Sequence, residues 1–417
     1  MTSLLSQPLA LPSGAILSNR IAKAAMSEGM ASPEGHSTPR LETLYRRWAT
    51  SGAGMLLSGN IQVDRWHLER PLNVVAEDTS GFDALRRLAA AGTSGGTHFW
   101  AQLSHTGRQV IEAINPAPLA PSDVEIDVLR GSGYRFARPR AMTPAEIEHA
   151  TAQFAYSADL VKRAGFTGLQ IHGAHGYLVS QFLSPRTNLR TDKWGGRLEN
   201  RARFLLDTLI AVRKAVGPDF PIGLKLNSSD FQRGGFSFSD CLEVVRMLKE
   251  TGLDLLELSG GSLEQPKVVG VAVKDEGEDG KRTSTAKREA YFIAMASAVR
   301  AVAAMPVMVT GGFRSLEAME AALQAGEVDV IGIGRPFIAD PGIAAKLLAG
   351  QVDRAPAPEA GLDLFHLQAW FNVQLERLAD GLDPDLSLTG EAASATFGPA
   401  EKRNTETLIA GRRMGTQ

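Results

Sequence analysis

The feature that most constrains the fold is a repeated alternation of short apolar runs with amphipathic helical stretches. Several of these runs are apolar on both faces, as buried parallel strands tend to be. Alternation of this kind predicts an α/β fold in which helices cover a parallel sheet. The predicted strands are residues 21–25, 54–59, 97–103, 168–172, 222–226, 253–258, 307–310 and 328–332.

The stretches between these runs carry helix start signals. Thr143, Pro144 and Glu146 form the pattern of a capping box with proline in the first turn. Thr38, Ser239 and Ser315 are expected to begin other helices. After Gly196, one apolar stripe repeats at helical spacing through Leu205, Leu209, Val212 and Val216.

Two architectures are compatible with this alternation, a (β/α)8 barrel and an open doubly wound sheet. Polar motifs follow six or more different strands, whereas an open sheet concentrates its ligands at one switch point. We therefore predict a TIM barrel over residues 1–350, with a long loop after strand 3 at 104–142 as a candidate lid. Residues 262–285 are predicted to form a solvated loop after the sixth strand.

Residues 351–417 are predicted to form a C-terminal extension. The apolar residues of 361–381 recur at helical spacing, which predicts a helix that packs on the barrel or on a partner subunit. Residues 383–417 show little periodicity and are expected to form an irregular or partner-wrapping tail. The aromatic side chains of the helix favour a homo-oligomer.

Composition excludes several classes of protein. Lys and Arg number 44 against 46 Asp and Glu, so no nucleic-acid partner is expected. A single cysteine, Cys241, excludes a disulfide framework or a cysteine-ligated cluster within the chain. No apolar run reaches the ~18 residues of a membrane span, and the N-terminus is a poor signal peptide. We expect a cytoplasmic protein with no membrane partner.

Glycines end the last two predicted strands. Gly311 and Gly312 follow one strand, and Gly332 and Gly334 end the next, beside Arg335. Backbone amides there can approach an anion closely, and barrels of this kind often bind phosphate after strands seven and eight. We therefore predict that these glycines bind the phosphate of a cofactor or substrate. The alternative is that they only make tight turns.

Other strand ends offer groups suited to a flat ring. Lys225 lies between Leu224 and Leu226, so alternation turns it into the barrel mouth, where it could meet an anion, an electron-rich ring or a Schiff-base substrate. Gln102 can read the edge of a heterocycle through its carboxamide. Small residues leave room for the ring beside Gly59 and in the stretch Ala24, Ala25, Met26 and Ser27.

His172, His175 and Tyr177 follow the fourth predicted strand. A metal site would need at least a third ligand, and no acidic pair lies near, so we predict no metal here. A buried structural role for one histidine stays open. Two imidazoles at a strand end could instead donate both N–H groups to one substrate oxygen, with Tyr177 as proton donor. Together with the phosphate and ring sites, this points to FMN.

The segment "IHGAHGYLVSQFLSPRTNLRTDKWGGRLENRARF" resembles the signature of the Old Yellow Enzyme family, which are FMN-dependent ene-reductases. The stretches "NRIAKAAMS", "AQLSHTGRQ", "KLNSSDFQRGGF", "SGGSLEQP" and "IGIGRPFIADP" are also similar to motifs of this family. The resemblance runs from about Asn19 to Pro341 and implies a TIM barrel that binds FMN and uses NAD(P)H.

The resemblance also implies roles for individual residues. Lys225 would lie near the pyrimidine part of the flavin, His172 and His175 would bind the substrate carbonyl or nitro oxygen, and Tyr177 would protonate the α-carbon of an activated alkene after hydride reaches the β-carbon. The phosphate would be held by Gly312, Gly334 and Arg335, and the ring would be contacted by Ala24, Ala25, Met26, Ser27, Gly59 and Gln102.

The sequence departs from the family at two sites. Ser27 stands where the family usually has threonine or cysteine, and "SEGMASPEG" lacks a substrate-facing tyrosine that some members carry. Two alternatives stay open: a cofactor-free barrel aldolase or isomerase with Lys225 as Schiff-base lysine, and a non-catalytic flavin-binding protein.

Overall fold

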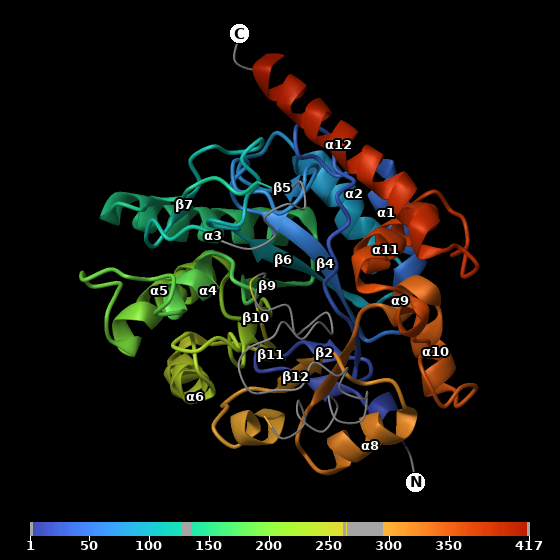
Figure 1. Cartoon of the computed structure of the whole chain (residues 1–417). Coiled ribbons are helices and arrows are strands. Elements are labelled where there is room, and N and C mark those ends of the chain that lie inside the picture. Colours follow the sequence, from blue (N-terminus) through green and yellow to red (C-terminus); the bar gives the residue numbers. More distant parts are fainter. Residues whose placement is uncertain (1–2, 127–134, 262–263, 265–294, 415–417) are drawn as a thin grey trace.

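The structure is a computed structural model that describes residues 3–126, 135–261, 264 and 295–414. Eight parallel strands close into a barrel, since β3 pairs with both β4 and β13. The predicted (β/α)8 barrel is confirmed (Figure 1). Its strands are β3 (Ile21–Lys23), β4 (Met55–Gln62), β6 (His98–Ser104), β9 (Gly168–Gly173), β10 (Ile222–Asn227), β11 (Leu255–Ser259), β12 (Val307–Thr310) and β13 (Val330–Ile333).

Each of the eight predicted apolar runs overlaps one of these strands. These runs are apolar because the strands are buried, and nearly every residue of the strands is inaccessible to solvent. Five short strands add to the eight: β1 (Leu9–Ala10) pairs with β2 (Ile16–Leu17), β7 (Leu119–Ala120) pairs with β8 (Arg140–Ala141), and β5 (Val74–Val75) pairs with the end of β4.

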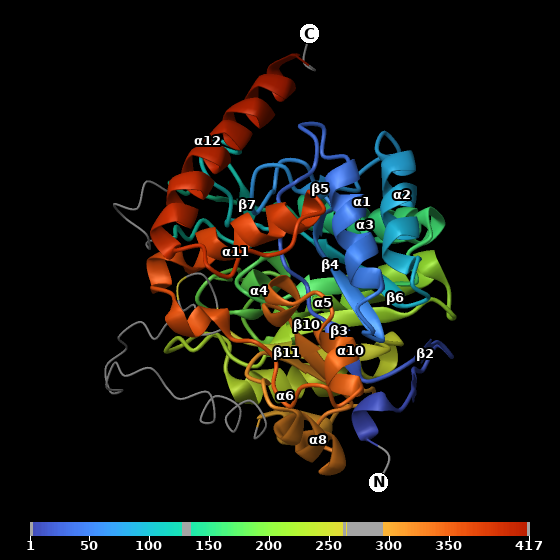
Figure 2. The ribbon, with the colours of Figure 1, turned by 90° about the vertical axis from the view of Figure 1, so that its right-hand side faces the viewer.

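Helices surround the barrel (Figures 1 and 2). The main ones are α1 (Pro39–Ala49), α2 (Phe82–Thr93), α3 (Pro144–Ala164), α5 (Leu198–Val216), α6 (Phe238–Met247), α8 (Leu316–Gln324) and α10 (Ile343–Leu348). Shorter elements are α4 (Leu178–Leu183), α9 (Pro336–Ala339) and the 3-10 turns η1 (Leu4–Ser6), η2 (Leu248–Thr251) and η4 (Pro358–Gly361).

The predicted helix starts are confirmed, but the capping residues of two helices differ from the prediction. Thr143 and Glu146 form the predicted capping box, and Ser315 accepts a hydrogen bond from the amide of Ala318. The helix expected to begin at Ser239 is capped by Ser237 instead, which forms its own capping box with Asp240. Thr38 occupies the N-cap position of α1, but its hydroxyl donates to the carbonyl of Met30 at 2.7 Å and does not cap the helix.

The barrel interior is filled by side chains that point inward from several strands. Leu57, Trp100, Leu255 and Met308 are fully buried in one cluster, which Leu11 and Leu17 of the N-terminal hairpin region join. This packing fills one part of the barrel with apolar side chains. The polar side chains predicted to form a site therefore have to lie toward the carboxyl ends of the strands.

The C-terminal extension is more ordered than its sequence suggests. α11 (Leu364–Ala379) packs against α1 and α9, and α12 (Gly390–Met414) is a long helix that lies along one side of the molecule (Figures 1 and 2). The expected irregular tail is thus wrong for residues 390–414. α12 is tied down by the ion pair of Arg70 with Glu401 at 2.9 Å and by Leu408, which is buried beside Leu68.

Several expectations stay predictions. These are the domain boundary at residue 350, the homo-oligomer and the lid role of residues 104–142; residues 127–134 of that loop lie outside the described ranges. Apart from Glu264, the predicted solvated loop at 262–285 also lies outside them. None of the helices in the described ranges combines the length and apolar character that a bilayer-spanning helix needs.

Candidate active site

Gln102 and Lys225 are connected by a chain of polar side chains across the carboxyl half of the barrel. The amide of Gln102 donates to Gln170 Oε1 at 2.6 Å, and Gln170 Nε2 donates to Glu257 Oε2 at 2.7 Å. Glu257 Oε1 then lies 3.0 Å from Lys225 Nζ. The four residues come from β6, β9, β11 and β10, and all are buried, so these strands jointly fix the Lys225 ammonium.

Sequence reasoning missed Gln170 and Glu257. Each is a polar residue inside an otherwise apolar strand, in "GLQIHG" and "LLELS". Because a buried polar group is costly without a partner, these two interruptions were a usable signal. The ion pair also bears on the Schiff-base alternative, since it engages the Lys225 nitrogen that would have to attack a carbonyl.

His172, His175 and Tyr177 come together as predicted. His172 is the next-to-last residue of β9, and the centroid of its ring lies 5.0 Å from that of His175 and 4.7 Å from that of Tyr177. His175 has a φ of 60°, which is unusual for a side chain larger than glycine. This backbone conformation is held by Asn227 Oδ1, which accepts from the His175 amide at 3.1 Å, and by Gln109, which donates to the His175 carbonyl at 2.8 Å.

Both imidazoles are neutral. Burial lowers the pKa of His175 to about 3 and holds the pKa of His172 well below its usual range, with the charge of Lys225 adding to both shifts. His172 Nδ1 accepts from the amide of Ala174 at 3.3 Å, which places the ring proton on Nε2. His175 Nε2 lies 2.7 Å from Ser259 Oγ. Neutral imidazoles of this kind can donate one N–H each without carrying a charge.

Glu69 is a site residue that sequence reasoning missed. Its carboxylate accepts hydrogen bonds from the hydroxyl of Ser27 and, at 2.6 Å, from the amide of Asn60. It also interacts with the Tyr177 hydroxyl. Burial is the main cause that raises the pKa of Tyr177 well above its usual range, and the charge of Glu69 adds to this shift. The phenol therefore stays protonated at neutral pH. Glu69 lies on the loop after β4, where no apolar periodicity marks it.

The glycines at the ends of β12 and β13 serve different purposes. Gly311 and Gly312 have φ of 102° and 88°, and a Cβ on Gly311 would meet nothing within 4 Å. A Cβ on Gly334 would face Met26 Sδ at 3.5 Å. Gly311 therefore has open space beside it, whereas a side chain on Gly334 would contact Met26 without a clash. Gly332 is different, because a Cβ there would lie 2.1 Å from Thr310 Oγ1, so its role is close packing.

Arg335 lies beside a second arginine, Arg314, at the end of the glycine-bearing strands. Glu359 of η4 pairs with Arg314 and lies 4.0 Å from Arg335. A carboxylate between two guanidinium groups shows that this corner of the molecule attracts an anion. The buried Thr310 Oγ1 has no hydrogen-bond partner in the described part of the chain.

The structure refines the predicted roles of Gly59 and its neighbours. The amide of Gly59 donates to Glu28 Oε1 at 3.0 Å and to Tyr45 Oη at 2.8 Å, so it is not available to a ring. Its missing side chain matters more, because a Cβ would lie 2.5 Å from the carbonyl of Met26. Gly59 therefore lets β4 approach the segment that contains Ala24, Ala25, Met26 and Ser27.

A group of two histidines and one aspartate lies elsewhere, after β4 and β6. Candidate ligand atoms of Asp64, His67 and His105 lie within 4.8 Å of one another. However, His67 Nε2 accepts from the Leu119 amide at 2.9 Å, and His105 Nδ1 accepts from the Gly107 amide at 3.1 Å. Both ring protons are thereby placed on the nitrogens that face Asp64. The group is a hydrogen-bonded cluster whose nitrogens do not offer lone pairs to a metal.

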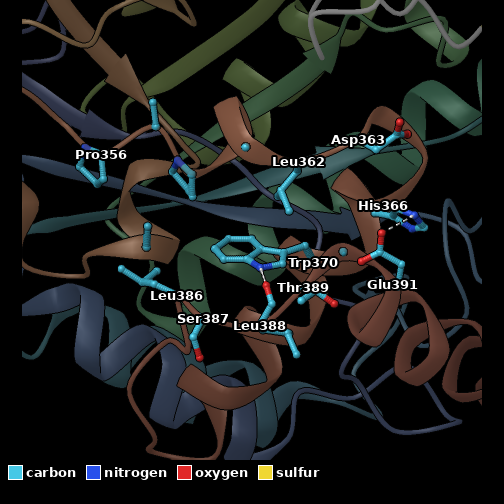
Figure 3. Close-up of a pocket in the computed structure, with 15 residues that line it drawn as sticks. Pro356, Leu362, Asp363, His366, Trp370, Leu386, Ser387, Leu388, Thr389 and Glu391 are labelled. Carbon is cyan, nitrogen blue, oxygen red and sulfur yellow. Dashed lines mark hydrogen bonds and ion pairs between the residues drawn. The ribbon is translucent and has the colours of Figure 1, made fainter.

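A cavity of about 590 Å³ lies in the C-terminal extension (Figure 3). It is lined by Trp370 and His366 of α11 and by the loop before α12, and the Trp370 indole N–H donates to the carbonyl of Leu388 at 2.9 Å. None of the predicted site residues lines it. The cavity is therefore separate from the group of polar side chains at the barrel strand ends.

Comparisons with known proteins agree with the fold and the strand-end motifs. The profile of the NADH:flavin oxidoreductase / NADH oxidase family matches residues 5–353. The chain belongs to this family, the predicted membership of the Old Yellow Enzyme family is confirmed, and the protein is a flavin oxidoreductase.

Individual relatives support the same assignment. The chain is 36% identical to NADH-dependent flavin oxidoreductase nadA of Aspergillus parasiticus, over 92% of this chain and 87% of that protein. It is 34% identical to NADH-dependent flavin oxidoreductase iliE of Hypocrea jecorina, over 81% and 86%. Among solved structures, a 2-naphthoyl-CoA reductase complex is similar with a TM-score of 0.76 and 25% identity, over 94% of this chain and 58% of that chain.

Proposed function

We propose that this protein binds FMN and uses NADH or NADPH to reduce the C=C bond of α,β-unsaturated carbonyl or nitro compounds. The observation that carries the proposal is the cluster of His172, His175 and Tyr177, two neutral imidazoles and a protonated phenol in ring contact at one strand end. NADH is the reductant that the names of the relatives favour.

The residues present fit FMN. The open space at Gly311 and the glycine at Gly334, with Arg335 close by, suit a phosphate. The Gln102 carboxamide suits the edge of a heterocycle, and the Lys225 ammonium suits negative charge on a ring. Bound FMN would supply the hydride that the nicotinamide delivers and the alkene accepts.

The protein's own groups have two tasks in this proposal. His172 and His175 each donate an N–H to the activating oxygen of the alkene, where negative charge grows as the β-carbon is reduced. Donors aimed at that oxygen lower the barrier more than they strengthen substrate binding. The Tyr177 O–H bond then breaks, and its proton forms the new bond at the α-carbon.

Steady-state turnover under anaerobic conditions tests the proposal. We expect NADH oxidation to depend on an added enone, nitroalkene or maleimide and to match the saturated product mole for mole. Protein that lacks flavin absorbance and traps a carbonyl substrate on Lys225 with borohydride would support the aldolase alternative. A bound flavin that neither NADH nor NADPH bleaches would support the non-catalytic alternative.

A second prediction concerns the histidine pair. His172→Ala and His175→Ala should each weaken the binding of a phenol to the oxidised holoenzyme by roughly tenfold, because one hydrogen bond to the ligand oxygen is lost. Titration of the flavin absorbance with the phenol measures this affinity. His149→Ala, on the outer helix α3, is the control and should bind like the parent. Parental affinity in both site variants would refute the oxygen-binding role.

A further inference from the structure

The Glu69 carboxylate contacts the Ser27, Asn60 and Tyr177 side chains at the barrel mouth. All three of these partners are neutral. Glu69 itself is only partly buried. Among the described residues, no cationic side chain forms a salt bridge with Glu69, although the guanidinium of the neighbouring Arg70 lies close enough to interact with its charge. The direct contacts of the carboxylate are hydrogen bonds.

The nearby charged groups are already matched with partners of opposite charge. Lys225 pairs with Glu257 at 3.0 Å, and Arg108 pairs with Glu264 at 2.6 Å. Arg70, the residue next to Glu69, makes two 2.9 Å hydrogen bonds to Glu401 and turns toward the C-terminal helix. The two histidines of the site are neutral. Of these four described carboxylates, Glu257, Glu264 and Glu401 each form a salt bridge and Glu69 does not.

We propose that Glu69 is a specificity-determining residue, which makes the site favour alkenes that carry a cationic or hydrogen-bond-donating substituent and disfavour carboxylates. This inference rests on the proposed function, because it assumes that the alkene binds against Tyr177. Because the carboxylate interacts with the Tyr177 hydroxyl, a charged substituent of an alkene bound there can come near it. At a separation of about 6 Å in a partly buried site, one unit charge changes affinity by roughly tenfold or more.

Maleimides with different groups on the imide nitrogen can isolate this charge effect, because the group lies off the reacting C=C bond. The set consists of N-(2-trimethylammonioethyl), neutral isosteric N-(3,3-dimethylbutyl) and N-(2-carboxyethyl) maleimide. For the parent holoenzyme we expect kcat/KM to be about tenfold or more higher for the cation than for the anion. Added salt should narrow that ratio.

Glu69→Gln should reduce the cation-to-anion ratio about tenfold, and this ratio is the readout, because loss of the Glu69 contact with Tyr177 can also change turnover of the neutral maleimide. Glu69→Asp keeps the charge and should keep the preference, which separates charge from a displaced loop. Glu77→Gln is the matched control, since Glu77 pairs with Arg65 further along the same region and lies outside the site. A ratio that Glu69→Gln leaves unchanged, or a parent that prefers the anion, would overturn the inference.

Binding of the corresponding saturated succinimides to the oxidised holoenzyme gives a readout that needs no turnover. We expect the parent to bind the cationic succinimide most tightly and the anionic one least tightly. In Glu69→Gln this difference in affinity should be lost. If no maleimide is reduced but the succinimides keep this order, the proposed function fails and the role of Glu69 stands. If maleimides are reduced with no dependence on charge in either assay, only the role of Glu69 fails.

Discussion

Tyr177→Phe should slow alkene reduction by at least about a hundredfold, because a positioned general acid contributes roughly 10² to 10⁴ in rate. The phenol is buried against His172, with ring centroids 4.7 Å apart, so phenylalanine keeps the packing and removes only the O–H group. Stopped-flow measurement of the alkene half-reaction under anaerobic conditions gives the rate. Bleaching of the flavin by NADH should stay within twofold of the parent, since that step needs no proton from Tyr177.

Tyr156→Phe provides the control for this prediction. Tyr156 is an exposed tyrosine of α3, and its replacement should alter neither half-reaction. An alkene half-reaction of Tyr177→Phe within threefold of the parent would show that another group delivers the proton. Equal slowing of both half-reactions would instead show damage to the flavin site.

Arg70→Met should destabilise the protein by about 3 kcal/mol, because it leaves the Glu401 carboxylate without its partner in a largely buried position. Arg70 also donates to Asn372 of α11 and lies 5.2 Å from the Phe397 ring of α12. A single guanidinium thus joins the loop after β4 to both C-terminal helices. We expect a lower midpoint of denaturant unfolding and faster amide exchange in α12.

Arg87→Met is the matched control for the Arg70 prediction. Arg87 pairs with Glu42 at 3.0 Å, but its side chain is 57% exposed, and exposed ion pairs contribute about 0–1 kcal/mol. The midpoint of this variant should therefore change little. If Arg70→Met unfolds at the parental midpoint with parental exchange in α12, the C-terminal helix is held by other contacts.

The strands could be predicted because their residues are buried on both faces, which leaves long apolar runs in the sequence. Lys225 could be oriented for a related reason, since alternation between Leu224 and Leu226 fixes the side of the strand it occupies. The α12 helix could not be predicted in this way. Its sequence contains Pro399 and several glycines, so its helical propensity is low and its tertiary contacts through Glu401 and Leu408 support it.

The residues of the candidate site also differ in whether a local sequence pattern predicts them. His172, His175 and Tyr177 are neighbours in the sequence at the end of one strand, so a local pattern was enough to group them. Glu69 reaches Tyr177 from a different loop, and nothing local links the two positions. Pairings between distant segments of this kind depend on how the loops return to the barrel mouth, which periodicity does not report.

The most direct test of the central claim follows the two half-reactions of the parent holoenzyme in sequence. Under anaerobic conditions, one equivalent of NADH should bleach the bound flavin, and one equivalent of 2-cyclohexenone should then restore its absorbance and yield cyclohexanone. In deuterated solvent the product should carry deuterium at the α-carbon, from the exchanged Tyr177 hydroxyl. A flavin that NADH bleaches but that stays bleached in the presence of enones and nitroalkenes would contradict the proposed activity.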